Sequence, residues 1–245
     1  NAGAVYAYTR TGDVWTQQAK LTAVGAAAYD NFGGSVAVNG DTAVIGARGY
    51  DGPAGSSSGA AYVFVRSGDV WTQQARLIAS DAAAGAVFGR SVVVEGDTAV
   101  IGAPGHDNAG GTNIGAAYVF VRSAGVWVEQ AILPAPEATW DQGFGESVAL
   151  SGNTAVIGAP GHGEEADEGP AAYVFVRSGT AWTQTATLVA PDLAWGESFG
   201  YSIALAGDTV LMGSHDQSNG VGIYAGAVYL FVRSGEVWSQ PTKFV

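Results

Sequence analysis

Short runs of apolar and polar residues alternate along the whole chain, and Gly, Asp or Ser bounds each run. Typical runs are Ser147–Leu150, Thr154–Gly158, Ala172–Arg177 and a segment that begins at Trp182. All are rich in Val, Ala, Tyr, Phe and Thr, which is the composition of β-strands. No segment places apolar residues at i, i+3, i+4 and i+7 over three turns, so no helix is expected. The pattern predicts an all-β protein.

These four strands, called a to d in chain order, recur at a fixed spacing. Strand a follows a Phe-Gly pair, and that pair recurs at Phe32, Phe88, Phe144 and Phe199, which are 56, 56 and 55 residues apart. The tryptophan that begins strand d recurs with the same period. A period of this size indicates a repeat architecture. A four-stranded sheet repeated radially is the blade of a β-propeller, so we expect a propeller-type fold.

The repeats predict a single array over residues 1–245, with a half blade in residues 1–31 and full repeats that begin near 32, 88, 144 and 199. The half blade holds only strands c and d, which gives 18 expected strands. Its missing strands a and b leave an exposed sheet edge. We therefore expect either that the chain is part of a longer one or that it forms a homo-oligomer that supplies these strands.

The connections between strands are expected to be of two kinds. Strands a and b join through tight turns such as Asn39-Gly40 and Glu95-Gly96, with Gly at the second position. The b–c and d–a connections are longer and vary among repeats. Because antiparallel strands alternate in direction, the two long connections share one face of the array. Variable loops on a rigid scaffold are where binding residues gather, so we expect the ligand on this long-loop face.

The Phe-Gly pairs and the triplets Gly102-Ala103-Pro104 and Gly158-Ala159-Pro160 resemble the FG-GAP repeats of integrin α-subunit propellers. They resemble the bacterial FG-GAP repeat proteins still more closely. The resemblance implies an extracellular propeller that binds proteins or glycans. Integrin-type blades also carry an Asp-rich calcium loop between strands a and b, which the tight turns here replace. No cofactor is therefore expected from the resemblance. A seven-bladed ring at this period would need about 390 residues.

Composition narrows the classes of partner. The net charge is −12, which repels phosphate backbones and makes nucleic acid an unexpected ligand. No apolar run reaches the roughly 18 residues that cross a bilayer, so no transmembrane segment is expected. The chain has no cysteine, and thus no disulfide or thiolate chemistry.

The long loops hold more than half of the 22 acidic residues and all three histidines. Candidate ligand-binding residues there are His106, Asp107, His162, His215 and Asp216. The histidines are interpreted as repeat-equivalent positions, which point radially and need not converge. Clustered carboxylates favour a cation such as calcium, and the densest cluster is Glu164, Glu165, Asp167 and Glu168. The alternative is an acidic rim that only maintains solubility.

Two tryptophans stand outside the repeating pattern. Trp140 and Trp195 lie four residues before Phe144 and Phe199, each among acidic residues. The acids are Glu137, Asp141, Asp192 and Glu197. An aromatic ring beside carboxylates can stack on a sugar while the oxygens bind its hydroxyls. Alternatively, each indole caps the junction between blades.

For catalysis the sequence offers no zinc-protease motif, no P-loop and no cysteine nucleophile. A Gly-x-Ser-x-Gly match at Gly55–Gly59 lies in a low-complexity loop with no helix after it, so it does not indicate a hydrolase. The expected function is a non-enzymatic, secreted or cell-surface adhesion module. A lectin is the alternative, and a polysaccharide-acting enzyme on a propeller scaffold comes third.

Overall fold

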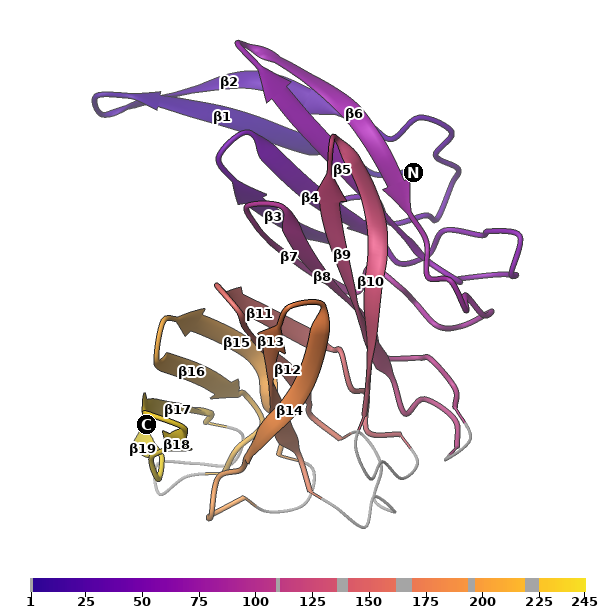
Figure 1. Cartoon of the computed structure of the whole chain (residues 1–245). Coiled ribbons are helices and arrows are strands. Elements are labelled where there is room, and N and C mark those ends of the chain that lie inside the picture. Colours follow the sequence, from indigo (N-terminus) through magenta and orange to yellow (C-terminus); the bar gives the residue numbers. More distant parts are fainter. Residues whose placement is uncertain (1, 109–110, 136–140, 162–168, 194–196, 219–224) are drawn as a thin grey trace.

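The computed structural model describes residues 2–108, 111–135, 141–161, 169–193, 197–218 and 225–245. Throughout these residues the regular structure is β-strand, with no helix (Figure 1). The all-β prediction is confirmed.

Three of the full repeats each form one four-stranded antiparallel sheet with its strands in chain order. The first sheet consists of β3 (Ser35–Asn39), β4 (Thr42–Ala47), β5 (Ala60–Ser67) and β6 (Val70–Leu77). The second consists of β7 (Ser91–Glu95), β8 (Thr98–Ala103), β9 (Ala116–Ser123) and β10 (Val126–Pro134). The third consists of β11 (Ser147–Ser151), β12 (Thr154–Ala159), β13 (Ala171–Ser178) and β14 (Ala181–Leu188).

The two ends of the chain form the remaining sheets. The expected half blade is a two-stranded sheet of β1 (Val5–Thr11) and β2 (Val14–Leu21). The C-terminal sheet consists of β15 (Phe199–Ala206), β16 (Thr209–Ser214), β17 (Ala227–Ser234), β18 (Val237–Trp238) and β19 (Thr242–Phe244). Both β18 and β19 pair with β17, so a single expected strand d is here divided in two.

The division of this strand has a cause in the sequence. In every earlier strand d the register with strand c shifts by one residue, which leaves a bulge at Gln18, Gln74, Gln130 or Thr185. Pro241 occupies the equivalent position in the last repeat. Proline cannot donate to the ladder and is tolerated in a sheet chiefly at edges and bulges. The array therefore has 19 described strands, where 18 were expected.

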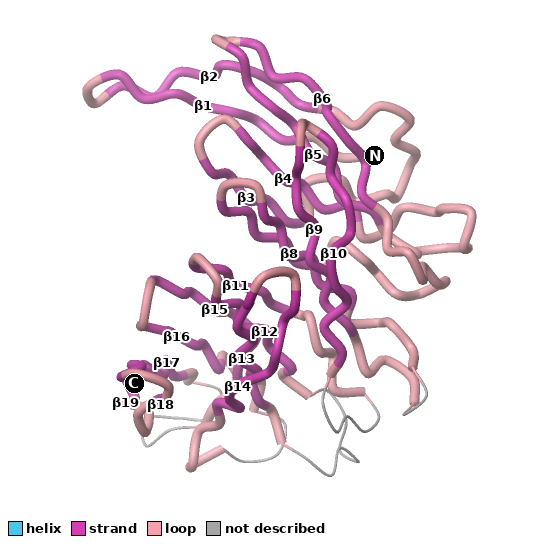
Figure 2. The backbone as a smooth tube through the Cα atoms, in the orientation of Figure 1, coloured by secondary structure: helices cyan, strands magenta, loops and turns pink. Residues whose placement is uncertain are grey.

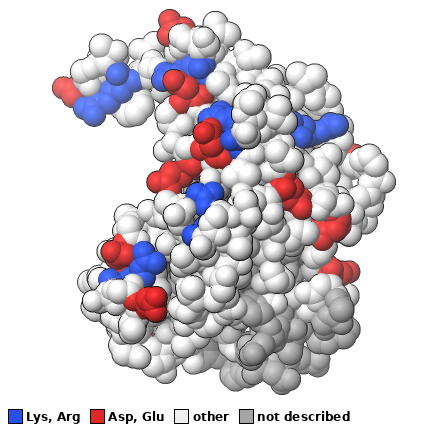
Figure 3. Space-filling model, viewed as in Figure 1, with Lys and Arg blue, Asp and Glu red and all other residues white. Residues whose placement is uncertain are grey.

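The sheets are stacked face to face in a fan, with the first strands of successive sheets side by side on the inside (Figure 1). Long connections lie along one side of the fan, and the a–b and c–d turns lie along the other (Figure 2). The fan is open: the surface is hollowed between the arm β1–β2 and the C-terminal sheets (Figure 3). Sheets of this composition stacked radially are the blades of a propeller-like array.

The hydrophobic core lies between the sheets. Strand b of the first three full repeats is buried along its entire length, because it is central in its sheet and is covered on both faces. Each junction packs one face of a sheet, such as Val44 and Val63, against the opposite face of the next, such as Ile101 and Phe120. Burying an apolar side chain of this size contributes about 1.5–3 kcal/mol, so the junctions supply most of the driving force for folding.

The Phe of each Phe-Gly pair anchors such a junction. Phe88 is buried and meets Tyr118 edge-on, with ring centroids 5.3 Å apart. Phe32, Phe144 and Phe199 repeat this contact with Tyr62, Tyr173 and Tyr229. Aromatic pairs in such geometry contribute beyond their buried area. The recurring Phe is thus a structural residue.

The a–b turns are tight, as expected, but the glycine has a different place. The flanking residues Asn39 and Thr42 pair with each other, so the two loop residues are Gly40 and Asp41. Gly40 is therefore the first loop residue, where the sequence had suggested the second. Its φ of 57° is the left-handed conformation that a type II′ hairpin requires at that position. The same holds in all four repeats.

Candidate binding face

At two junctions in the described part of the chain, the long loops of neighbouring sheets are hydrogen-bonded to each other. In the first junction, the amides of Gly85, Val87 and Phe88 donate to the carbonyls of Ser56, Ser57 and Ser58. In the second, Asp141, Gly143 and Phe144 donate to Thr112, Asn113 and Ile114. The b–c loop of one sheet thus pairs with the d–a connection that leads into the next. This pairing gives the long-loop face a fixed backbone despite its variable sequence.

Asp107 and Asp141, two candidate ligand-binding residues, have local structural roles in these loops. The Asp107 carboxylate accepts a hydrogen bond from the Asn113 amide at 2.8 Å, which closes the b–c loop. Asp141 has a φ of 60°, at a position where other repeats place Gly85 and Tyr29, also with positive φ. Aspartate is among the few residues other than glycine that adopt this conformation readily.

His106 belongs to a partly buried contact between a loop and strand c. The Tyr118 hydroxyl donates to Asp81 at 2.8 Å, and His106 lies 3.4 Å from the same hydroxyl. Its other ring nitrogen lies 3.5 Å from Asp81. Burial raises the pKa of Tyr118, and the hydrogen bond to the Asp81 carboxylate raises it further. The contact therefore favours the neutral phenol, which ties a d–a loop to the sheet that it precedes.

Asp192 is the equivalent of Asp81 in the last repeat. It accepts hydrogen bonds from the Tyr229 hydroxyl at 2.9 Å and from Lys243 at 2.7 Å. Burial alone would raise the pKa of Asp192, but these two donors outweigh it and lower the pKa. Glu137 stands at the same position in the third repeat, outside the described residues. Asp192 therefore helps to hold the last sheet together.

The interpretation of the histidines as repeat equivalents is wrong for His215. Gly226 donates to the carbonyl of Gln217 as Gly115 does to that of His106, so Gln217 is the equivalent of His106. His215 instead follows strand β16 directly, two residues earlier in the repeat. The last repeat reads Gly-Ser-His where the second reads Gly-Ala-Pro-Gly-His, so the two histidines stand at different distances from the end of strand b.

His215, Asp216 and Glu197 form a second polar group near the end of β16. His215 lies 3.0 Å from the Asp216 carboxylate, which also accepts the Ser198 hydroxyl at 2.9 Å. Glu197 is buried and accepts the Ser218 amide at 2.9 Å. In a catalytic triad the histidine lies between the serine and the aspartate. Here Ser198 and His215 both contact Asp216 directly, so these residues do not form a triad.

The remaining sequence candidates lie outside the described residues: Trp140, Glu137, Trp195, His162, Glu164, Glu165, Asp167 and Glu168. In the part of the chain that the structure describes, no three His, Asp or Glu side chains are grouped so that they could hold a metal ion. The described ranges also contain no helix that is long and apolar enough to cross a membrane.

One cluster was not anticipated from the sequence. The residue after each Phe-Gly pair is Gly34, Arg90, Glu146 or Tyr201. In the structure the last three converge from three sheets: Arg90 donates to the Glu146 carboxylate and, at 3.0 Å, to the Tyr201 hydroxyl. The hydrogen bond to Glu146 raises the pKa of Arg90 and outweighs its burial. The Tyr201 ring in turn lies 4.6 Å from that of His215.

This central cluster lies where the innermost strands begin, at the long-loop end of the fan. Repeat-equivalent residues converge there because strand a is the innermost strand of each sheet, so neighbouring copies are close. The signal in the sequence was a position that changes chemical type in every repeat while the residues around it stay constant. The residue type can change at such a position because the neighbouring Phe, Gly and Ser provide the contacts between sheets.

The stacked four-stranded sheets, the Phe-Gly anchors and the shared loop face define a propeller-type repeat protein. The FG-GAP repeat matches the chain four times, at residues 15–64, 71–120, 127–175 and 182–231. The chain therefore belongs to the FG-GAP repeat family, whose repeats suggest a module of binding or adhesion type. No curated protein matched the chain in sequence.

Proposed function

We propose that this chain is a non-enzymatic adhesion module of the cell exterior, secreted or at the cell surface, that binds a protein partner on its long-loop face. The observation that carries the proposal is the convergence of Arg90, Glu146 and Tyr201 from three sheets at the inner, long-loop end of the fan. Glu146 is buried there, whereas Arg90 and Tyr201 remain partly exposed. Arginine and tyrosine are typical of protein-binding hot spots. The paired loops around them provide the rigid rim.

Electrostatics suggest the character of the partner. The chain has a net charge of −12, and its long loops carry acidic residues such as Asp51, Asp107 and Asp216. A basic protein surface would be attracted to this face, and the rate of association would fall as salt concentration rises. FG-GAP repeats are typically extracellular, which is consistent with a partner on or outside cells.

The test is binding of the immobilised chain to an array of purified extracellular proteins, repeated with matched variants. Arg90→Ala with Tyr201→Ala alters the centre of the loop face. Asp13→Ala with Asp69→Ala alters the turns on the opposite side. We expect the first pair to weaken binding at least about tenfold and the second to leave it unchanged. Binding that follows the turn variants instead would refute the proposed face.

A carbohydrate ligand is the second candidate, favoured by the position of Trp140 and Trp195 just before two Phe-Gly pairs. A glycan array run with calcium and again with a chelator distinguishes the two ligands. Glycan binding that Trp140→Ala with Trp195→Ala abolishes would establish a lectin, and sensitivity to the chelator would assign calcium to the acidic loops. Turnover of a glycan, abolished by a carboxylate-to-amide change, would instead establish an enzyme.

A further inference from the structure

The outer face of the C-terminal sheet is apolar and uncovered. This C-terminal face consists of Leu211, Val228, Leu230, Val232 and Phe244. Leu211 is 41% exposed, whereas its equivalents Val44, Val100 and Val156 are fully buried. Phe244 is 51% exposed, although its equivalents Leu77, Leu133 and Leu188 are buried. In each of those copies the next sheet covers the face.

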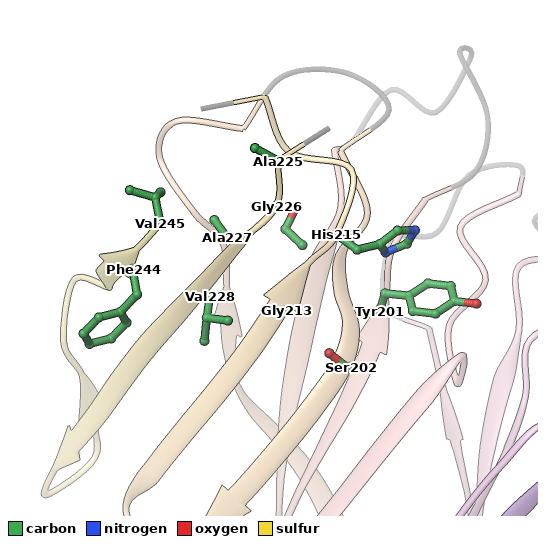
Figure 4. A pocket seen from close by; sticks show the side chains of 11 residues that line it. Tyr201, Ser202, Gly213, His215, Ala225, Gly226, Ala227, Val228, Phe244 and Val245 are labelled. Carbon is green, nitrogen blue, oxygen red and sulfur yellow. The ribbon is translucent and has the colours of Figure 1, made fainter. Parts of the chain in front are cut away.

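At one end of the C-terminal face lies an open depression of about 650 Å³. Its lining includes Tyr201, Ser202, Gly213, Gly226 and Phe244 (Figure 4). Strands β15, β16 and β17 form its floor, and Tyr201 and His215 stand together at one side (Figure 4). The depression is thus built from the ends of three neighbouring strands.

The equivalent place in the first full sheet is occupied by the Phe-Gly pair of the next sheet. The Phe88 amide donates to the Ser58 carbonyl at 3.2 Å, and Gly59 forms a parallel bridge with Phe88. The Ser35 hydroxyl donates to the Gly89 carbonyl at 2.8 Å. That carbonyl lies so close to Gly46 that a methyl group there would overlap it.

The two following junctions repeat this arrangement. Ser91 and Ser147 donate to the carbonyls of Gly145 and Gly200, at 2.8 and 2.6 Å. A methyl group at Gly102 or Gly158 would overlap the same carbonyl oxygens. In three junctions, therefore, an equivalent serine and glycine contact the Phe-Gly pair of the next sheet. We call this serine and glycine, with the glycine that precedes strand c, the seat.

The depression contains every part of this seat. Ser202 and Gly213 are the equivalents of Ser35 and Gly46, and Gly226 keeps the positive φ, 78°, of Gly59. A methyl group at Gly213 would meet only atoms of Ser202 of its own sheet, since no neighbouring sheet lies over it. The hydroxyl donor of Ser202, the space beside Gly213 and the exposed apolar face are therefore all present.

We propose that this depression is a binding site for the Phe-Gly pair that opens strand a of a further FG-GAP repeat. The chain's own four pairs are not available, because Phe32, Phe88, Phe144 and Phe199 are all buried in their junctions. A second folded copy of residues 1–245 therefore has no free pair to supply. The occupant is an additional repeat whose Phe-Gly pair has no seat of its own.

The seat discriminates at both residues of the pair. The phenyl ring fills the apolar end of the junction, as Phe88 does against Tyr118 and Phe120. The glycine has a φ of 82° to 96° in all four observed pairs, a range that a residue with a side chain rarely adopts. A Phe-Ala or Ala-Gly segment is therefore a poor ligand.

The direct test is a lengthened chain, in which a second copy of residues 78–97 follows Phe244 in place of Val245. Phe88 stands 11 residues after Leu77, so the added Phe stands equally far from Phe244. Linking the segment in this way keeps its effective concentration high. We expect the midpoint of thermal unfolding to rise by on the order of 5 °C. The amide resonances of Ser202, Gly213 and Gly226 should shift in the NMR spectrum.

Two controls make the result specific. The same extension with its Phe-Gly pair changed to Ala-Ala should give neither effect. Gly213→Ala should abolish both effects in the lengthened chain and lower the unfolding midpoint of the original chain by less than about 3 °C. Equal effects from both extensions, or no influence of Gly213→Ala, would overturn the proposal.

A peptide experiment covers the case in which the lengthened chain does not fold. A synthetic peptide of residues 86–96 is titrated into the original chain, with its Phe→Ala form as control. Shifts of the Ser202 and Gly213 amides with the first peptide alone support the seat, and identical spectra with both refute it. Self-association of the original chain that Gly213→Ala prevents would show a second copy as the occupant, contrary to the proposal. Tyr201 borders both this depression and the central cluster. Gly213→Ala leaves Arg90, Glu146 and Tyr201 in place, so it tests the seat separately from the proposed function.

Discussion

The covered junctions and the open C-terminal face are made from the same residues in different surroundings. In the covered junctions, Ser35, Ser91 and Ser147 donate across to the next sheet, and a methyl group on the glycine opposite each would overlap both a carbonyl of the next sheet and the serine hydroxyl of its own sheet. On the open face, Ser202 and Gly213 keep the same residue types without that neighbour. The same serine and glycine therefore contact the next sheet in three junctions, and on the open face they contact only each other.

The largest contrast is expected for the phenylalanines. Phe88→Ala empties a buried site in a covered junction and should lower the free energy of unfolding by about 3–5 kcal/mol. Phe244→Ala on the open face should lower it by about 1 kcal/mol, because that side chain is already half exposed. Urea unfolding followed by tryptophan fluorescence measures both. Similar losses for the two would mean that the junctions are not the core.

Glycine substitutions should sharpen the same contrast. Gly102→Ala drives a methyl group into the Gly145 carbonyl and should destabilise the chain by about 2–3 kcal/mol. Gly213→Ala meets only the movable Ser202 side chain and neighbouring atoms of that residue, so we expect less than about 1 kcal/mol. The measurement is again the free energy of unfolding in urea. A large loss for Gly213→Ala would mean that this glycine serves its own sheet.

The serine hydroxyls give a smaller difference. Ser91→Ala removes the donor to the Gly145 carbonyl and should cost about 1 kcal/mol. Ser202→Ala should be close to neutral in the same unfolding assay. If both substitutions were neutral, the hydroxyl would be dispensable for joining sheets, and the seat on the open face would lose one of its recognition groups.

The smallest effect concerns pH and Tyr118 in a covered junction. Its folded pKa is raised by burial, so its contribution to stability is complete below the unfolded pKa, near 10, and is lost as pH rises above it. The loss should reach about 0.4 kcal/mol at pH 10. The stability difference between the original chain and Tyr118→Phe should shrink by this amount from pH 7 to pH 10. A constant difference would show that Tyr118 titrates normally.

The period of the sequence was sufficient to predict the sheets, because each repeat obeys the same physical constraints. Three of the five recurring tryptophans make structural contacts between sheets, as expected, whereas Trp15 on the half blade is 64% exposed. Trp71, Trp127 and Trp182 each donate to the bulge glutamine of the preceding sheet, Gln18, Gln74 or Gln130. Each also lies beside an arginine of its own sheet, as Trp127 does with Arg122 at 5.2 Å. The identity of the glutamine could not be predicted, because it depends on a bulge that the strand pattern does not reveal.

The candidate site was harder to predict for the same reason. Which repeat-equivalent side chains meet depends on their radial distance within the fan, and a linear pattern does not contain that distance. Arg90, Glu146 and Tyr201 are 56 and 55 residues apart, yet they touch because they lie on innermost strands. His106 and His215 seemed equivalent and are not, because the end of strand b varies in sequence. The local sequence pattern is enough to predict the strands. The candidate site depends on which side chains meet in three dimensions, and the pattern does not contain that information.

Each matched FG-GAP unit begins at the tryptophan of strand d in one sheet and ends in strand c of the next. A unit therefore carries strand d of one sheet together with strands a to c of the next, so it supplies one Phe-Gly pair to the preceding unit and one serine–glycine seat to the following unit. Insertion or excision of whole units by recombination would consequently leave every remaining interface matched. The length of such an array can change during evolution by steps of one unit, without compensating mutations elsewhere.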